Sequence, residues 1–382
     1  MKRNAKRAGI QKRVLLIGIG LFNLTLRPVA AAEITLPDVE MTSRASTEEG
    51  KFVLGTAISA DLALYGGYKY AFLLGFSLDT TDITDFKQMV PNFRIAQASA
   101  RDIFGLPVEL SYFFGSYDDF CNGDDFVSQF GLSPFGTEFL DFYYFPLGIR
   151  YKGIYGVRGT GLALGLNKWE NIYLIMYLYR ELSFLGAAFG GIGESYYSDA
   201  VYSGDLRLLF NHGWLRLETF AGFSLNTDLK TRIRGGLMVY LAGNGVEFFA
   251  QAGIPGWTIK ENFKIDNLYF LLEPRLRLGI FGINVTFFYH PWEYMHILTD
   301  KERGKADINV KFLFGNPNTG LAGGIEAGGE VKLDGFEDFV LRISPFGSLV
   351  SGGLRWDAKL RIRPLKAPKE MFEILFGVRT AF

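Results

Sequence analysis

Residues 370–382, the last thirteen of the chain, read EMFEILFGVRTAF, and this stretch decides the fold. One parity carries Phe372, Ile374, Phe376, Val378 and Phe382, and the other carries Glu373, Gly377, Arg379 and Ala381, with Leu375 as its apolar exception. Alternation with a period of two is typical of a β-strand that has one apolar face and one mixed face. We therefore expect a final strand that closes on an aromatic residue.

This segment resembles the carboxy-terminal assembly signal of bacterial outer-membrane β-barrel proteins. The resemblance implies that Phe372, Phe376 and Phe382 form a signal that the barrel-assembly machinery recognises. A buried edge strand of a soluble domain would show the same alternation. The rest of the chain has to distinguish the two interpretations.

The amino-terminal residues predict export. Residues 1–13 carry six basic side chains and no acidic one, residues 14–26 are almost entirely apolar, and residues 29–33 read VAAAE. A basic region, a short apolar core and an Ala-x-Ala site indicate a secretory signal peptide, here residues 1–32, cleaved after Ala32. A transmembrane anchor would need about 20 apolar residues. Residues 33–50 are then expected as a short periplasmic segment that precedes a barrel over residues 51–382.

The charge and cysteine content exclude other classes of protein. The full chain has 40 basic and 40 acidic residues, and the predicted signal removes seven basic ones, which leaves 33 − 40 = −7. A mildly acidic chain lacks the basic footprint of a nucleic-acid-binding protein, so no nucleic-acid partner is expected. Because Cys121 is the only cysteine, the chain is not a disulfide-stapled domain.

The body of the chain consists of short alternating segments. Residues 354–363 (LRWDAKLRIR) place Leu354, Trp356, Ala358, Leu360 and Ile362 on one face and Arg355, Asp357, Lys359, Arg361 and Arg363 on the other. In a soluble sandwich the charged face would meet bulk water, whereas in a membrane barrel it would line a wet lumen. Beyond the signal we find no uncharged stretch of 20 residues, so helical membrane spans are not expected.

Short and longer connections alternate between these segments. The short connections are 351–353, 315–320, 281–282, 243–245 and 211–213, and the intervening ones are 364–369, 334–338, 290–305, 253–267, 226–230 and 191–199. Short turns on one side and longer loops on the other are typical of bacterial outer-membrane barrels. We expect an all-β fold, a transmembrane antiparallel up-and-down β-barrel of roughly 16–18 strands. A literal count gives about nineteen, which conflicts with an even number, and the conflict lies between Lys51 and Phe189.

An acidic segment interrupts the alternation between residues 115 and 137. Its aspartates are Asp118, Asp119, Asp124 and Asp125. The arrangement resembles porins, in which an inward-folded acidic loop faces basic wall residues. Candidate pore-lining residues are Arg275, Arg277, Arg355, Asp357, Lys359, Arg361 and Arg363. The alternative is an extracellular acidic loop with no part in conduction.

No motif asks for catalysis or a metal. The aspartate spacing does not match a calcium loop, residues 290–296 (HPWEYMH) fit no standard zinc site, and no G-x-S-x-G elbow occurs. The chain is therefore expected to be neither an enzyme nor a metal or cofactor protein. Aromatic clusters at residues 143–145, 196–197 and 289–294 are expected in the interfacial girdles of the barrel.

The resemblance implies a porin-like channel in the outer membrane that passes small hydrophilic solutes, with outer-membrane lipid and the assembly machinery as partners. A fatty-acid-transporter-like barrel for hydrophobic ligands is a second possibility, which the high Phe content favours. The lack of an Asn-Pro-Ala motif and of a long amino-terminal hatch argues against it. A non-conducting surface barrel and a secreted β-sandwich are further alternatives. The sequence leaves the oligomeric state open.

Overall fold

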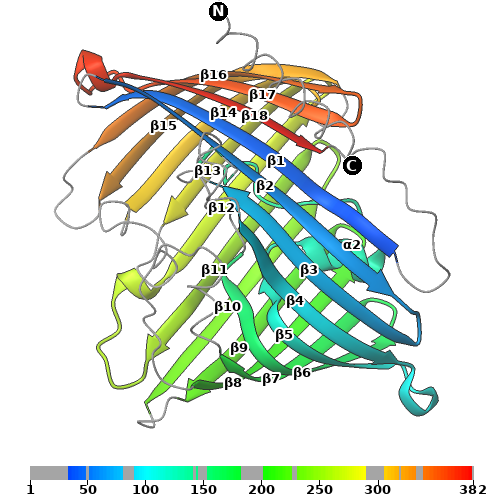
Figure 1. Cartoon of the computed structure of the whole chain (residues 1–382). Coiled ribbons are helices and arrows are strands. Elements are labelled where there is room, and N and C mark those ends of the chain that lie inside the picture. Colours follow the sequence, from blue (N-terminus) through cyan, green and yellow to red (C-terminus); the bar gives the residue numbers. More distant parts are fainter. Residues whose placement is uncertain are drawn as a thin grey trace, which may run out of the picture.

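The strands form one antiparallel sheet of eighteen strands that closes on itself (Figure 1). The computed structural model describes residues 33–48, 51–80, 90–140, 143–144, 153–181, 201–225, 230–289, 305–317, 320–332 and 339–380. The strands are β1 (Glu33–Glu48), β2 (Lys51–Gly66), β3 (Tyr70–Thr80), β4 (Val90–Arg101), β5 (Val108–Phe120), β6 (Tyr155–Trp169), β7 (Ile172–Glu181), β8 (Val201–His212), β9 (Leu215–Leu225), β10 (Thr231–Ala242), β11 (Val246–Thr258), β12 (Tyr269–Leu278), β13 (Phe281–Tyr289), β14 (Lys305–Gly315), β15 (Leu321–Lys332), β16 (Val340–Ser351), β17 (Leu354–Ile362) and β18 (Phe372–Thr380). Helix α2 (Asp124–Phe130) and three 3₁₀ turns, η2 (Ile103–Gly105), η3 (Ile265–Asn267) and η5 (Pro368–Glu370), complete the described elements.

Each strand pairs with the next in sequence, and β18 pairs with β1 to close the ring. In that closing pair, Glu40 lies opposite Arg379 and Ser46 lies opposite Glu373. A closed ladder satisfies every strand on both sides, which is the condition for crossing a bilayer with β-structure. The predicted antiparallel barrel is confirmed, and its strand number is even.

The segment expected to precede the barrel is instead its first strand. Residues 33–48 form β1, which pairs with β2 from Glu48 back to Glu33. The prediction for residues 33–50 was wrong because a run of Ser, Thr and acidic residues hides the alternation. The register of β1 also shifts between Thr35 and Asp38, around Pro37, where no strand signal is visible in the sequence.

The two rims of the barrel differ as expected. Turns at 213–214, 243–245, 279–280 and 352–353 lie on one rim, which we call the short-turn rim, and the opposite rim carries the connections 121–154, 259–268 and 363–371. One turn expected at 281–282 lies two residues earlier, at Gly279, whose φ of 61° suits glycine. The two-residue connection between β1 and β2 is the exception on the long-loop rim.

The two faces of the sheet are inverted relative to a soluble protein. On β18, Phe372 and Ile374 point outward and are 52% and 58% exposed, whereas Glu373 points inward and is 3% exposed. On β14, Ile308 is exposed and Asp307 is buried in the same way. Apolar residues cover the outside and charged residues fill the inside, as hydrocarbon around a polar lumen requires.

Among the described residues, no helix has the length and apolar character needed to cross a membrane.

Aromatic side chains at the short-turn rim lie on the outside, but they are not the ones expected from the sequence. Tyr68, Tyr70, Trp169 and Trp214 are exposed beside the short turns, where interfacial girdles lie. Of the predicted girdle residues, Tyr143, Tyr144 and Tyr289 are partly or fully buried, and their hydroxyls donate hydrogen bonds to groups of the barrel. Residues 196–197 lie outside the described residues.

Candidate pore constriction

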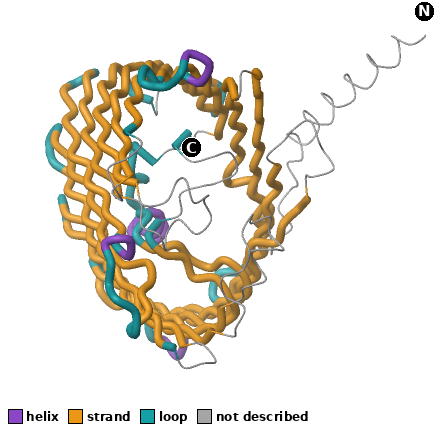
Figure 2. Tube along the Cα trace, turned by 90° about the vertical axis from the view of Figure 1, so that its left-hand side faces the viewer, coloured by secondary structure: helices purple, strands orange, loops and turns teal. Residues whose placement is uncertain are grey.

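The connection between β5 and β6 folds into the ring of strands. We call residues 121–144 the inward segment, of which 121–140 and 143–144 are described. Figure 2 shows α2 and its adjoining loop inside the ring of strands. The backbone leaves β5 through left-handed conformations at Cys121 (φ 63°) and Gly123 (φ 91°), which turn the chain away from the direction of the strand.

Arg207 on β8 fixes the start of the inward segment. It is 0% exposed, and its Nη1 lies 2.7 Å from Oδ2 of Asp118, while it also pairs with Asp125 of α2. Its Nε donates to Oε1 of Glu218 at 2.7 Å, and the same oxygen accepts the backbone N–H of Cys121 at 2.5 Å. One guanidinium therefore joins the entering strand, the helix and the wall strand β9.

Aromatic packing reinforces this first anchor. The ring of Phe120 lies 4.9 Å from that of Phe220 on β9 and 5.3 Å from that of Tyr177 on β7. Phe126 of α2 is fully buried and its ring lies 5.3 Å from that of Phe135. The phenylalanines that looked excessive for a solvated loop are the ones that dock it against the wall.

The middle of the inward segment is held on β12. The buried carboxylate of Glu273 accepts the hydroxyl of Thr137 at 2.7 Å and the backbone N–H of Glu138 at 2.9 Å. Arg275, on the same strand, donates to the carbonyl oxygen of Gly136 and lies 2.6 Å from Glu273. Donors and acceptors of the segment's backbone thus find charged partners, which form the stronger class of hydrogen bond.

The carboxylate of Glu138 has its own partners on the wall. Arg277 on β12 pairs with one of its oxygens, and Nδ2 of Asn284 on β13 donates to the other at 2.5 Å. Burial alone would raise the pKa of Glu138, but the nearby charges of Arg275, Lys311 and Arg277 and the Asn284 hydrogen bond outweigh it, so the pKa lies below its ordinary value. Glu138 is therefore ionised at neutral pH and held by cations.

The end of the inward segment reaches the opposite side of the ring. The hydroxyl of Tyr144 donates to Asp307 on β14, and that of Tyr143 donates to the carbonyl oxygen of Asp357 on β17 at 2.8 Å. Nη2 of Arg361 donates to the carbonyl oxygen of Tyr143 at 2.9 Å. In a closed ring of eighteen strands, β8 and β17 are 17 − 8 = 9 places apart. The segment is consequently fastened to diametrically opposite walls.

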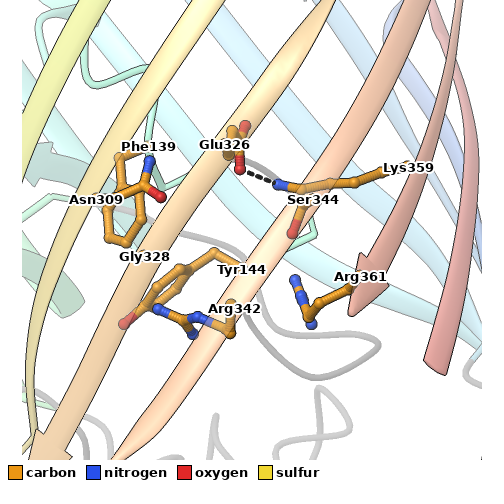
Figure 3. A pocket seen from close by; sticks show the side chains of 9 residues that line it. All are labelled: Phe139, Tyr144, Asn309, Glu326, Gly328, Arg342, Ser344, Lys359 and Arg361. Atoms are coloured by element: carbon orange, nitrogen blue, oxygen red, sulfur yellow. Dashed lines mark ion pairs between the residues drawn. The ribbon is translucent and has the colours of Figure 1, made fainter. Parts of the chain in front are cut away.

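A polar cavity lies beside this last anchor (Figure 3). Within it, Nζ of Lys359 pairs with Glu326 at 2.6 Å. Its lining residues are Phe139 and Tyr144 of the inward segment and Asn309, Glu326, Gly328, Arg342, Ser344, Lys359 and Arg361 of the wall. Side chains of both signs therefore face a space between the segment and strands β14 to β17.

The candidate wall residues found in the sequence fall into two groups. Arg275, Arg277 and Arg361 contact the inward segment directly. The others pair with acids of the strands: Arg355 with Asp357 at 3.0 Å, Lys359 with Glu326 at 2.6 Å, and Arg363 with Glu373 at 2.7 Å. None of the described contacts brings these six cations onto the four aspartates, as the sequence interpretation had expected.

The aspartates have other partners. Asp118 and Asp119 belong to β5 rather than to a loop, and they pair with Arg207 and Arg158 respectively. Asp125 joins the Arg207 cluster, while Asp124 begins α2 and its backbone N–H donates to the side chain of Asn122. The aspartates approach the wall at β6 and β8, far round the ring from β17.

Three residues central to the arrangement were absent from the predicted site: Arg207, Glu218 and Glu138. Arg207 and Glu218 each lie on the polar parity of an alternating segment, and this parity was the available signal. Glu138 offered none, because it follows the acidic stretch in a region without periodicity. Its partner Arg277 is 139 residues away in sequence, a contact that only the closed barrel creates.

Among the described residues, no group of three or more His, Cys, Asp or Glu side chains is placed to hold a metal ion. His290 and His296 lie outside the described residues.

Solved porin structures share this fold. A structure described as "Asymmetric conductivity of engineered proteins" has 9% sequence identity and a TM-score of 0.50, covering 92% of this chain and 100% of that one. A multiply substituted mutant of Rh. blastica porin gives 8% identity, a TM-score of 0.50 and the same coverage. OccK11 from Pseudomonas aeruginosa gives 11% identity and a TM-score of 0.47, over 92% of this chain and 95% of its own.

Identities this low demonstrate a shared fold and nothing finer. No family model matches the chain. No curated protein sequence matches it either.

Proposed function

We propose that this protein is a porin-like channel of the bacterial outer membrane that lets small hydrophilic solutes diffuse through its lumen. The observation that carries the proposal is the inward segment, which charged and aromatic contacts fasten to opposite walls of a polar-lined barrel. Such a segment narrows an aqueous path and surrounds it with fixed charges of both signs, which is how pores select among solutes. Outer-membrane lipid and the barrel-assembly machinery are the partners that this proposal implies.

The chemistry of the inner wall argues against the hydrophobic-ligand alternative. A barrel that carries fatty acids needs an apolar groove inside. The inward-facing side chains on β8, β9, β12 and β14 include instead the buried charged residues Arg207, Glu218, Glu273, Arg275 and Asp307. A β-sandwich in water is disfavoured because large apolar side chains cover the outside of this ring.

Reconstitution of the purified full chain into planar lipid bilayers tests the proposal. We expect stepwise ion currents whose size does not depend on detergent carry-over, with buffer containing detergent alone as the control. Bilayers that remain silent, with protein that has the altered gel mobility of a folded barrel before boiling, would contradict the channel and support a non-conducting surface barrel. Fractionation of cell envelopes should find the protein with outer-membrane lipid.

The proposal includes a test of the fixed charges. Arg355 and Arg363 face inward but make no described hydrogen bond to the inward segment. A channel that carries both Arg355→Gln and Arg363→Gln should shift its reversal potential in a salt gradient toward cations, because two positive charges leave the lumen. Adding Arg361→Gln should enlarge the shift but also loosen Tyr143. Arg180→Gln, at an exposed position on β7, is the matched control, and equal reversal potentials in all variants would refute the assignment.

A further inference from the structure

Arg216 differs from the other arginines inside the barrel. It lies at the start of β9 on the same parity as Glu218, which points inward. Within the described part of the chain, Arg216 makes neither a hydrogen bond nor an ion pair, and its Nε is enclosed without an acceptor. Arg207, Arg234 and Arg275 are by contrast all paired with carboxylates.

Two aromatic rings hold the guanidinium of Arg216 in place. Phe135 of the inward segment stacks on Tyr240 of β10, with ring centroids 4.7 Å apart and planes 21° apart. The guanidinium carbon of Arg216 lies 4.7 Å from the centroid of Phe135 and 5.0 Å from that of Tyr240. Arg216 and Tyr240 are also direct cross-strand partners. The rings stabilise the cation through their π-faces but offer its N–H groups no acceptor.

The acids close to Arg216 in the sheet are already engaged. Glu218, two residues along β9, is held by Arg207 at 2.7 Å, and Glu247 on β11 lies 3.4 Å from Arg275. Arg216 itself is neither fully buried nor fully exposed. Its guanidinium is therefore a fixed positive charge with unused donors, two residues from the short-turn rim and next to the inward segment.

We propose that Arg216 is the centre of a binding subsite for a small oxyanion, most directly a carboxylate. A guanidinium presents its donors in a planar fork that matches two carboxylate oxygens, and an incoming anion would supply the acceptors that Arg216 lacks. The Phe135–Tyr240 ring pair keeps the fork oriented, so little side-chain entropy is lost on binding. The inference rests on the proposed function, since solutes reach Arg216 through the lumen.

Calorimetric titration of sodium benzoate into the detergent-solubilised full chain tests the subsite at constant ionic strength. We expect saturable binding to the unmodified protein and at least about tenfold weaker binding to Arg216→Gln, because a bidentate charged contact is lost. Arg216→Lys should keep part of the affinity, since a lysine supplies charge without the planar fork. Phe135→Leu, which leaves the charge in place but removes one ring, should weaken binding by a smaller factor.

Arg363→Gln is the matched control, because it removes an inward-facing arginine that already has a carboxylate partner. Equal benzoate affinity in Arg216→Gln and the unmodified protein, or no saturable binding to either, would overturn the subsite. Each variant must first show the gel mobility of a folded barrel.

The same variants in bilayers separate the two proposals. Ion currents together with unchanged benzoate affinity in Arg216→Gln would leave the channel standing and remove the subsite. Benzoate binding that depends on Arg216 in a barrel that never conducts would do the reverse.

Discussion

At the scale of single residues, the inward segment depends on a small number of buried charges. Arg207 alone meets the carboxylates of Asp118, Asp125 and Glu218. Removing one partner from such a buried group costs about 3–5 kcal/mol, because the remaining charges stay desolvated. Charges of this kind add little to stability compared with apolar packing, but they make one docked position of the segment far better than its neighbours.

Glu138 allows a test by substitution and by pH. Glu138→Gln replaces the paired carboxylate and should weaken the middle anchor by about 2 kcal/mol, so single channels should show more frequent current fluctuations. The same effect should develop in the unmodified protein in acid. Because the folded-state pKa of Glu138 is lowered, its contribution is complete above the ordinary pKa of about 4.3 and is lost as the pH falls through the folded value.

The comparison is made by recording both proteins from pH 7 to pH 3. The variant should fluctuate at pH 7 as the unmodified channel does in acid. Identical noise in the two proteins at pH 7 would mean that Glu138 does not restrain the segment.

At the scale of elements, alternation predicted which side chains share a face but not how the strands meet. The segment 354–363 is a good example, since the inward parity of β17 has the charged residues expected from the sequence. Their partners could not be predicted, because Arg361 reaches Glu373 only through the register of β17 with β18. Strand β1 was missed because propensity is weak along it, and its place is set by the strands on either side.

Strand β2 provides a test of the two faces. Ser59 shares its inward parity with Asp61, whereas Leu62 points outward and is 39% exposed. Ser59→Cys should react with a charged, water-soluble thiol reagent and lose conductance as the label narrows the lumen. Leu62→Cys should resist the reagent because lipid shields it. The native thiol gives little background, since Cys121 is fully buried, and equal labelling of both positions would show that the faces are assigned wrongly.

At the scale of the whole molecule, closure was predictable and the filling of the lumen was not. The apolar parity of residues 370–382, the short turns and the polar inner faces all indicated a barrel. The path of the inward segment depends on contacts such as that between Tyr143 and Asp357, 214 residues apart. No periodicity reports pairings over such distances, so the sequence suggested an acidic loop in the pore but matched it with the wrong cations.

The closing strand supports a prediction about assembly. Phe372 and Phe376 lie on the outer face of β18, and Phe382 lies outside the described residues. If residues 370–382 are the assembly signal that they resemble, deletion of Phe382 should lower the amount of folded protein in the outer membrane more than it alters solute passage through the barrels that do form. Quantitative envelope blots and conductance per folded molecule measure the two effects. Normal membrane levels would leave these residues as an ordinary strand.

The contacts of the inward segment also constrain the order in which the protein can be built. The segment belongs to the first half of the chain, yet its far end is held by Asp357 and Arg361, which enter the ring almost last. Both ends of the segment continue into neighbouring strands, β5 and β6, so a finished ring would have to admit a folded loop through its mouth. The simpler history is that the wall is laid down around a plug that is already in place, which makes the segment a mould for the curvature of the last strands.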